Sequence, residues 1–88
     1  MAYKVRFTKQ AAKDYRLLRS SPAILKRLDK LIGIIGVNPF QSPPLYEKLS
    51  GDLEGYYSRR LNIKHRLVYE VLESEIKVLA IWSHYENL

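Results

Sequence analysis

The feature that most constrains the fold is a change of hydrophobic spacing halfway along the chain. Residues 9–35 place apolar side chains three and four positions apart, which is the spacing of one face of an α-helix. A loop at residues 38–44 follows and holds three of the four prolines. Beyond this loop the apolar residues alternate or form short runs, as in β-strands. A chain ordered in this way predicts an α+β fold.

Two helices are expected before the loop. Thr8 can cap the first helix, for which the apolar spacing covers residues 9–19. Pro22 suits the first position of a second helix over residues 22–35. Gly36 is expected to end that helix in the left-handed conformation, which glycine adopts at little cost.

The remaining segments predict five β-strands, at residues 3–8, 46–49, 56–61, 65–71 and 75–83. Short turns between the later strands imply an antiparallel sheet. The helices should cover one face of this sheet and leave the other open. Residues 1–88 are therefore expected to form a single domain, with an N-terminal strand and a two-helix hairpin packed on one face of a small antiparallel sheet.

Composition narrows the classes of partner and site. Eighty-eight residues build one compact core. The formal charge of +6, from 15 Lys and Arg against 9 Asp and Glu, favours nucleic acid or an acidic protein segment as the partner. The absence of cysteine excludes disulfides, thiolate metal sites and a cysteine nucleophile. No apolar run is long enough to span a bilayer and no leader is visible, so a cytoplasmic protein without a membrane partner is expected.

The sequence predicts neither a metal nor a cofactor. His65 and His84 lack the spacing of metal ligands, and no cluster of Asp and Glu accompanies them. No glycine-rich phosphate loop is present, and Ser58 and Ser83 lack an obvious acid–base pair. His65 lies beside a turn, where it is expected to be solvated. His84 ends the last strand, where a structural and a functional role are both open.

A pair of arginines on neighbouring strands is the first candidate for a binding site. If the turn after Leu61 takes about three residues, Arg60 lies opposite Arg66 on the same face, with Cβ atoms about 5 Å apart. Two like charges so close cost stability unless an anion lies between them. Glu47 is one such anion, and a phosphate held by arginine is another. A salt-bridged surface and a phosphate site are therefore the alternatives.

Four tyrosines in the C-terminal half could stack on bases, as aromatic side chains do in RNA recognition: Tyr56, Tyr57, Tyr69 and Tyr85. Most tyrosines in a small sheet instead belong to its core or its edges. We therefore expect Tyr57 and Tyr69 to be sheet residues and Tyr85 to contact a base.

These residues together resemble the RelE/ParE superfamily of bacterial toxins, specifically its Txe/YoeB branch. The matching pieces are Glu47, Leu53, Tyr57-Ser58-Arg59-Arg60, His65-Arg66-Leu67-Val68-Tyr69 and His84-Tyr85. Their combination at compatible spacing is specific, whereas any one piece alone would not be. The N-terminal half agrees in outline, so the resemblance covers nearly the whole chain and implies a RelE-like domain.

The resemblance implies the toxin of a type II toxin–antitoxin pair. Members of this branch are similar to metal-independent endoribonucleases that enter the ribosomal A site, cut mRNA there and so inhibit translation. The implied partners are a cognate antitoxin, the ribosome and mRNA, and a homodimer is compatible with this reading. We expect the antitoxin to use the exposed apolar positions of the first helix and the groove around the sheet.

The resemblance also assigns roles to residues. Glu47 resembles the general base, Arg66 the phosphate-stabilising arginine, His84 the general acid and Tyr85 the tyrosine that supports the substrate. Arg60 resembles an accessory basic residue. Further RNA contacts are implied for Tyr56, Arg59, Arg60 and His65.

The sequence departs from the family pattern at two places, and two other functions remain open. The chain continues with residues 86–88 after His84-Tyr85, and Glu47 lies in a segment that differs from the usual family pattern. A ParE-like, gyrase-inhibiting toxin would share the fold but lack nuclease residues, so Arg66 and His84-Tyr85 argue against it. A non-catalytic module that binds RNA or an antitoxin would show salt-dependent RNA affinity without cleavage.

Overall fold

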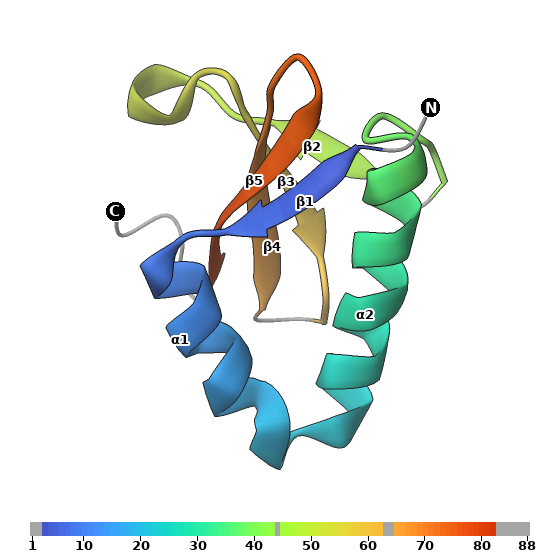
Figure 1. Ribbon diagram of the computed structural model, residues 1–88, viewed down its shortest axis with the longest axis vertical. Coiled ribbons are helices and arrows are strands. Elements are labelled where there is room, and N and C mark those ends of the chain that lie inside the picture. Colours follow the sequence, from blue (N-terminus) through green and yellow to red (C-terminus); the bar gives the residue numbers. More distant parts are fainter. Residues whose placement is uncertain (1–2, 44, 63–64, 83–88) are drawn as a thin grey trace.

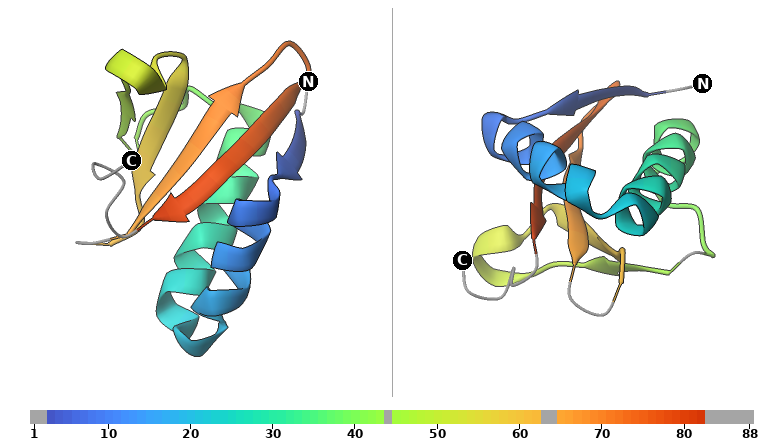
Figure 2. Two further views of the ribbon diagram at one scale, coloured as in Figure 1. Left: turned by 90° about the vertical axis from the view of Figure 1, so that its left-hand side faces the viewer. Right: turned by 90° about the horizontal axis from the view of Figure 1, so that it is seen from below.

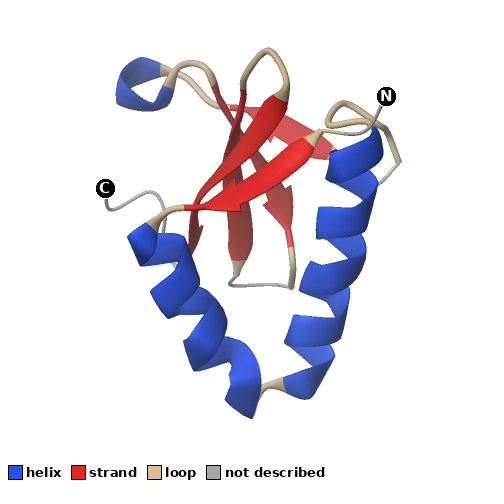
Figure 3. Cartoon of the chain, viewed as in Figure 1, coloured by secondary structure: helices blue, strands red, loops and turns tan. Residues whose placement is uncertain are grey.

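The computed structural model describes residues 3–43, 45–62 and 65–82, which form two helices and a five-stranded sheet (Figures 1 and 3). The elements are β1 (Lys4–Phe7), α1 (Lys9–Leu17), α2 (Pro22–Val37), β2 (Tyr46–Lys48), β3 (Tyr56–Arg60), β4 (Arg66–Val71) and β5 (Glu75–Trp82), with 3-10 turns at Leu18–Ser20 and Gly51–Leu53. Both helices and all five strands therefore lie where the sequence predicts them. No helix in this part of the chain is long and apolar enough to cross a membrane.

The sheet is mixed, with the strand order β1-β5-β4-β3-β2. The neighbours among β2, β3, β4 and β5 are antiparallel, as predicted, whereas β1 pairs with β5 in parallel. A short turn forces the two strands it joins to run antiparallel. No such turn joins β1 to β5, because the two helices and three strands separate them in sequence. The description as an antiparallel sheet is thus right for four strands and incomplete at the β1 edge.

The first helix begins at its predicted cap. The side-chain oxygen of Thr8 accepts a hydrogen bond from the backbone N–H of Ala11 at 3.1 Å. The same hydroxyl donates to the carbonyl oxygen of Leu79 on β5 at 2.7 Å. One side chain therefore satisfies an orphan donor of the helix and ties the helix start to the sheet.

The second helix ends later than predicted. It continues through Gly36 to Val37, and Asn38 leaves it with extended dihedral angles. Gly36 does not take a positive φ, so its expected role as a left-handed stop is wrong. Its carbonyl oxygen instead accepts a hydrogen bond from the backbone N–H of Tyr3 at 2.6 Å. The end of α2 is thus fastened to the chain just before β1.

The core lies between the helices and the sheet, and Figure 2 shows both helices on the same side of the strands. Its buried members are Ala11, Leu18, Leu28, Leu31, Ile35, Leu61, Leu67, Tyr69, Ile76, Val78 and Ile81. Because side chains alternate along a strand, Leu67 and Tyr69 on β4 face the helices, while Arg66 and Val68 face away. Neither α1 nor α2 covers this second face, which we call the open face as predicted, although Ser58 and Val68 on it are buried.

Asp14 fastens α1 to the end of β5. Its Oδ2 accepts a hydrogen bond from the backbone N–H of Ile81 at 2.9 Å, and its Oδ1 accepts from Nε2 of Gln10 at 2.8 Å. The carboxylate is buried, and these bonds satisfy both of its oxygens. They hold the strand from which the predicted residues His84 and Tyr85 follow in sequence.

Candidate active site

The centre of the candidate site is an ion pair on the open face of the sheet. Nη1 of Arg66 on β4 lies 3.1 Å from Oε1 of Glu47 on β2. The two strands are not neighbours, because β3 lies between them. Ser58 of β3 stands directly opposite Glu47, and its small side chain leaves room for the longer ones to meet above it. The structure therefore confirms that Glu47 is an anion beside the arginine pair.

Arg60 adds a second cation to this face. It pairs directly with Arg66 in the β3–β4 register, as the predicted turn length requires. The Arg60 side chain is exposed, and it forms no ion pair with any residue of the described ranges. Among the described residues at this place, one carboxylate therefore accompanies two guanidinium groups. The local charge is positive and suits a phosphate, which arginine can bind through two parallel hydrogen bonds.

These side chains line an open pocket of about 470 Å³. Its lining residues are Leu45, Tyr46, Glu47, Ser58, Arg60 and Arg66. The Glu47 side chain is 58% exposed and that of Arg66 is 18% exposed. The carboxylate can therefore reach a bound molecule, while the arginine is held more firmly. Within residues 3–43, 45–62 and 65–82, no three metal-ligating side chains come together.

Ser58 lies at the base of the pocket and has an unusual hydroxyl. The residue is 1% exposed, and its Oγ is buried without a hydrogen-bond partner among the residues that the structure describes. An unpaired buried hydroxyl costs about 1–3 kcal/mol, so such groups are uncommon. Sequence reasoning placed Ser58 within the Tyr57-Ser58-Arg59-Arg60 motif but assigned it no role, because no acid–base pair accompanies it. The two-residue alternation from Ser58 to Arg60 could have placed it on the site face.

The position of Arg59 differs from the one predicted. Its side chain is 1% exposed, so the expectation that it contacts RNA is wrong. Nε donates to the hydroxyl of Tyr69 at 3.1 Å, and Nη2 donates to the carbonyl oxygens of Pro39 at 3.1 Å and Gln41 at 2.9 Å. The guanidinium carbon also lies 5.2 Å from the centroid of the Tyr46 ring. Arg59 therefore fastens the proline-containing loop and β2 to the core.

The tyrosines largely follow the expectation for a small sheet. Tyr69 is fully buried and Tyr57 packs against the core, as predicted. Burial raises the pKa of the Tyr69 hydroxyl, and the hydrogen bond from Arg59 opposes that rise. Tyr56 is half-buried and shares the face of Ser58 by strand alternation. Its RNA contact stays a prediction.

His65 has a local structural role. Its backbone N–H donates to Oδ1 of Asn62 at 2.6 Å, and its Nδ1 lies 3.2 Å from the same oxygen. These contacts close the turn between β3 and β4 and fit the expectation of a turn residue, while an RNA contact stays a prediction. His84 and Tyr85 lie outside the described residues, so their predicted roles stay predictions as well.

The sequence and the fold resemble those of known proteins. A family model described as the YoeB-like toxin of bacterial type II toxin–antitoxin systems matches residues 7–85. The chain belongs to this family. The toxin YoeB of Synechocystis sp. is 34% identical over 85 residues, which cover 96% of this chain and 99% of the relative. The toxin YoeB of Streptomyces coelicolor is 35% identical over 83 residues, covering 93% and 99%.

Solved YoeB structures agree with the fold. The toxin chain in the YoeB–YefM complex from Staphylococcus aureus superposes with a TM-score of 0.82 at 34% identity, covering 97% of this chain and 100% of that one. The YoeB/ParE toxin from Agrobacterium tumefaciens gives a TM-score of 0.86 at 32% identity, covering 93% and 99%. The YafQ chain of the Escherichia coli DinJ–YafQ complex, at 17% identity and a TM-score of 0.81, shares the fold. This YoeB-family chain is thus a RelE/ParE-type toxin of a type II system.

Proposed function

We propose that this YoeB-family toxin is a metal-independent endoribonuclease that cuts mRNA on the ribosome and thereby inhibits translation. The observation that carries the proposal is the Glu47–Arg66 ion pair beside Arg60, in an open pocket on the free face of the sheet. RNA cleavage by the 2′-hydroxyl needs a base, cations that bind the phosphate and an acid for the leaving oxygen, and this pocket supplies the first two.

The proposed reaction begins when the substrate phosphate takes the place of Glu47 beside Arg66. The freed carboxylate of Glu47 removes the proton from the ribose 2′-hydroxyl, and that oxygen attacks the adjacent phosphorus. His84 then protonates the departing 5′ oxygen, which leaves a 2′,3′-cyclic phosphate on the other fragment. An imidazole can supply this proton because both of its protonation states are accessible near neutral pH.

Each of these roles makes a typical contribution to the reaction rate. A placed base or acid contributes about 10²–10⁴-fold to the rate. A donor aimed at the charge that develops on the phosphorane contributes about 10²–10³-fold. Arg66 is the better placed of the two arginines for this, since its side chain is mostly covered and it contacts Glu47 directly. Arg60 supports the phosphate from the neighbouring strand, and Tyr85 supports the substrate.

We also propose that an antitoxin of the YefM kind holds the toxin inactive, and that the chain can form a homodimer. The Staphylococcus aureus relative was solved as a YoeB–YefM complex and as a YoeB dimer. The α1 helix offers an exposed apolar side chain, Leu17. An open pocket between the helices, lined in part by Phe7, Tyr15 and Ile32, adds apolar surface beside it. These features support the antitoxin surface expected from the sequence.

The deciding experiment is primer extension on a defined mRNA in a purified translation reaction. Wild type is compared with Arg66→Ala and His84→Ala, and Arg6→Ala serves as the matched control. Arg6 also forms a 3.1 Å ion pair, with Glu75, but at the opposite edge of the sheet. We expect ribosome-dependent cuts with wild type and Arg6→Ala, and none with the other two variants. Intact mRNA with wild type would reject the nuclease and direct attention to gyrase inhibition or to binding alone.

A further inference from the structure

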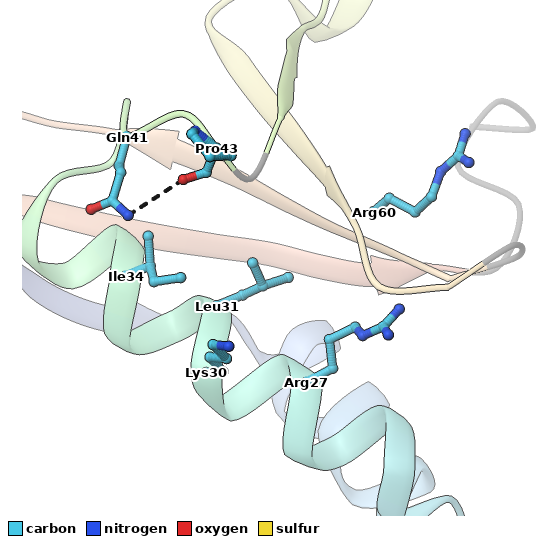
Figure 4. Close-up of a pocket in the computed structure, with 7 residues that line it drawn as sticks. All are labelled: Arg27, Lys30, Leu31, Ile34, Gln41, Pro43 and Arg60. Atoms are coloured by element: carbon cyan, nitrogen blue, oxygen red, sulfur yellow. Dashed lines mark hydrogen bonds between the residues drawn. The ribbon is translucent and has the colours of Figure 1, made fainter.

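We propose that a second pocket, between α2 and the end of β3, binds the phosphodiester next to the one that is cleaved. This proposal rests on the proposed nuclease function, which it extends by a substrate-binding subsite. The pocket has a volume of about 500 Å³ and is lined by Arg27, Lys30, Leu31, Ile34, Gln41, Pro43 and Arg60 (Figure 4).

The lining of this pocket selects an anion with an attached apolar or planar group. Three of its residues are cations, namely Arg27, Lys30 and Arg60, and none is acidic. None of the three forms an ion pair within the described ranges. Like charges gathered around one pocket repel each other, so a bound anion would stabilise them. Leu31, Ile34 and Pro43 supply an apolar wall against which a ribose or base can pack.

Arg27 is already held in place. Its Nη1 donates a hydrogen bond of 2.7 Å to the carbonyl oxygen of Leu61, the residue that follows β3. A guanidinium has five N–H donors, so this bond leaves others for a ligand. It also reduces the side-chain freedom that binding would otherwise remove. In Figure 4, Arg27 extends from α2 and Arg60 extends from β3, and the Arg60 guanidinium points away from the apolar residues of the pocket.

The position of Arg60 connects this pocket with the candidate active site. Arg60 lines both pockets, and Arg66 stands directly opposite it on β4. The cations therefore form a row that leads from Arg66 through Arg60 to Arg27 and Lys30. A single RNA strand carries one charge per nucleotide, so a strand with its scissile phosphate at Arg66 would place a neighbouring phosphate along this row. This continuity favours RNA over an acidic peptide as the occupant.

The test measures binding of short RNA to the full-length toxin. The probe is a tetranucleotide with a 2′-deoxy sugar at the cleaved position, because removal of the attacking hydroxyl prevents cleavage. Lys30→Gln removes one cation of the pocket, and Lys30→Gln combined with Arg27→Gln removes two. Lys13→Gln removes the same charge from exposed α1 and is the matched control. Circular dichroism verifies that each variant is folded.

We expect the Lys30 variant to bind the tetranucleotide about three- to tenfold more weakly, and the double variant to bind more weakly still. The slope of log affinity against log salt should fall by about 0.7 for each phosphate of the single strand that a variant no longer neutralises. Lys13→Gln should match wild type in both respects. If wild type binds and cuts RNA while both pocket variants keep its affinity and slope, the subsite is wrong and the nuclease proposal stands.

Two further outcomes also reject the subsite. If wild type neither binds the probe nor cuts mRNA, the subsite and the proposed function fail together. If the pocket variants bind RNA normally but lose affinity for a polyglutamate peptide, the pocket is a site for an acidic protein segment.

Discussion

Arg59 and Arg60 are adjacent in sequence, but substitutions at the two positions are expected to affect different properties of the protein. Arg59 is buried among the core, β2 and the proline-containing loop, whereas Arg60 is exposed on the site face. We consider Arg59→Met and Arg60→Met, because methionine keeps much of the length of the side chain and removes its charge and donors. The first change should reduce stability and the second should reduce cleavage.

The magnitude for Arg59 follows from its hydrogen bonds. The substitution removes three of them, to the Tyr69 hydroxyl and to two carbonyl oxygens, and a bond to a charged group contributes about 1.5–3 kcal/mol. The Pro39 carbonyl keeps the hydrogen bond that the Tyr69 hydroxyl donates to it at 2.9 Å, which limits the destabilisation. The interaction with the Tyr46 ring adds about 0.5–2 kcal/mol. The methionine variant no longer has to bury a charge, which offsets part of this loss of stability. We therefore expect a net destabilisation of about 3–5 kcal/mol.

Urea denaturation followed by circular dichroism at 25 °C and neutral pH measures this destabilisation. Typical domains unfold with about 5–15 kcal/mol, so Arg59→Met should be only marginally folded. Arg60→Met should stay within about 1 kcal/mol of wild type while its single-turnover cleavage of ribosome-bound mRNA falls. A destabilisation below about 1 kcal/mol for Arg59→Met, or equal values for both variants, would refute the structural role assigned to Arg59.

Three other predictions follow from single side chains. Arg66→Ala should slow single-turnover cleavage at least as much as Glu47→Ala, because the arginine bears the phosphorane charge; a rate close to that of wild type would remove Arg66 from the mechanism. Burial raises the pKa of Tyr69 above its ordinary value of 10.0, so the tyrosine ionises first in the unfolded chain and wild type loses stability as the pH rises above 10. Urea denaturation should therefore show a smaller loss of stability between pH 8 and pH 11 for Tyr69→Phe than for wild type. Equal losses of stability in the two proteins would contradict this. Ser58→Ala should raise the free energy of unfolding by up to about 1 kcal/mol by removing an unpaired buried hydroxyl, and a clear decrease would show that the hydroxyl has a partner.

The sequence determined the elements of this protein and the pairing at the centre of its site. Helical spacing, the Thr8 cap and the proline-containing loop are local signals, and local chemistry decides where helices and strands form. The position of Arg60 opposite Arg66 followed from the length of one turn, because a hairpin sets the register of the strands it joins. Glu47 was one of two anions expected beside them, the other being a bound phosphate, and Glu47 forms the ion pair.

Tertiary packing decided what local signals do not contain. Gly36 stayed helical because its carbonyl is bonded to Tyr3 from a distant segment, and β1 joined β5 in parallel because no turn connects them. Arg59 and Arg60 carry the same functional group, and only the side of the sheet each one faces separates a buried anchor from an exposed site residue. An arginine is stable in a core only when neighbouring carbonyls and hydroxyls satisfy its donors. Those acceptors come from segments far apart in sequence, which is why folding was needed to assign them.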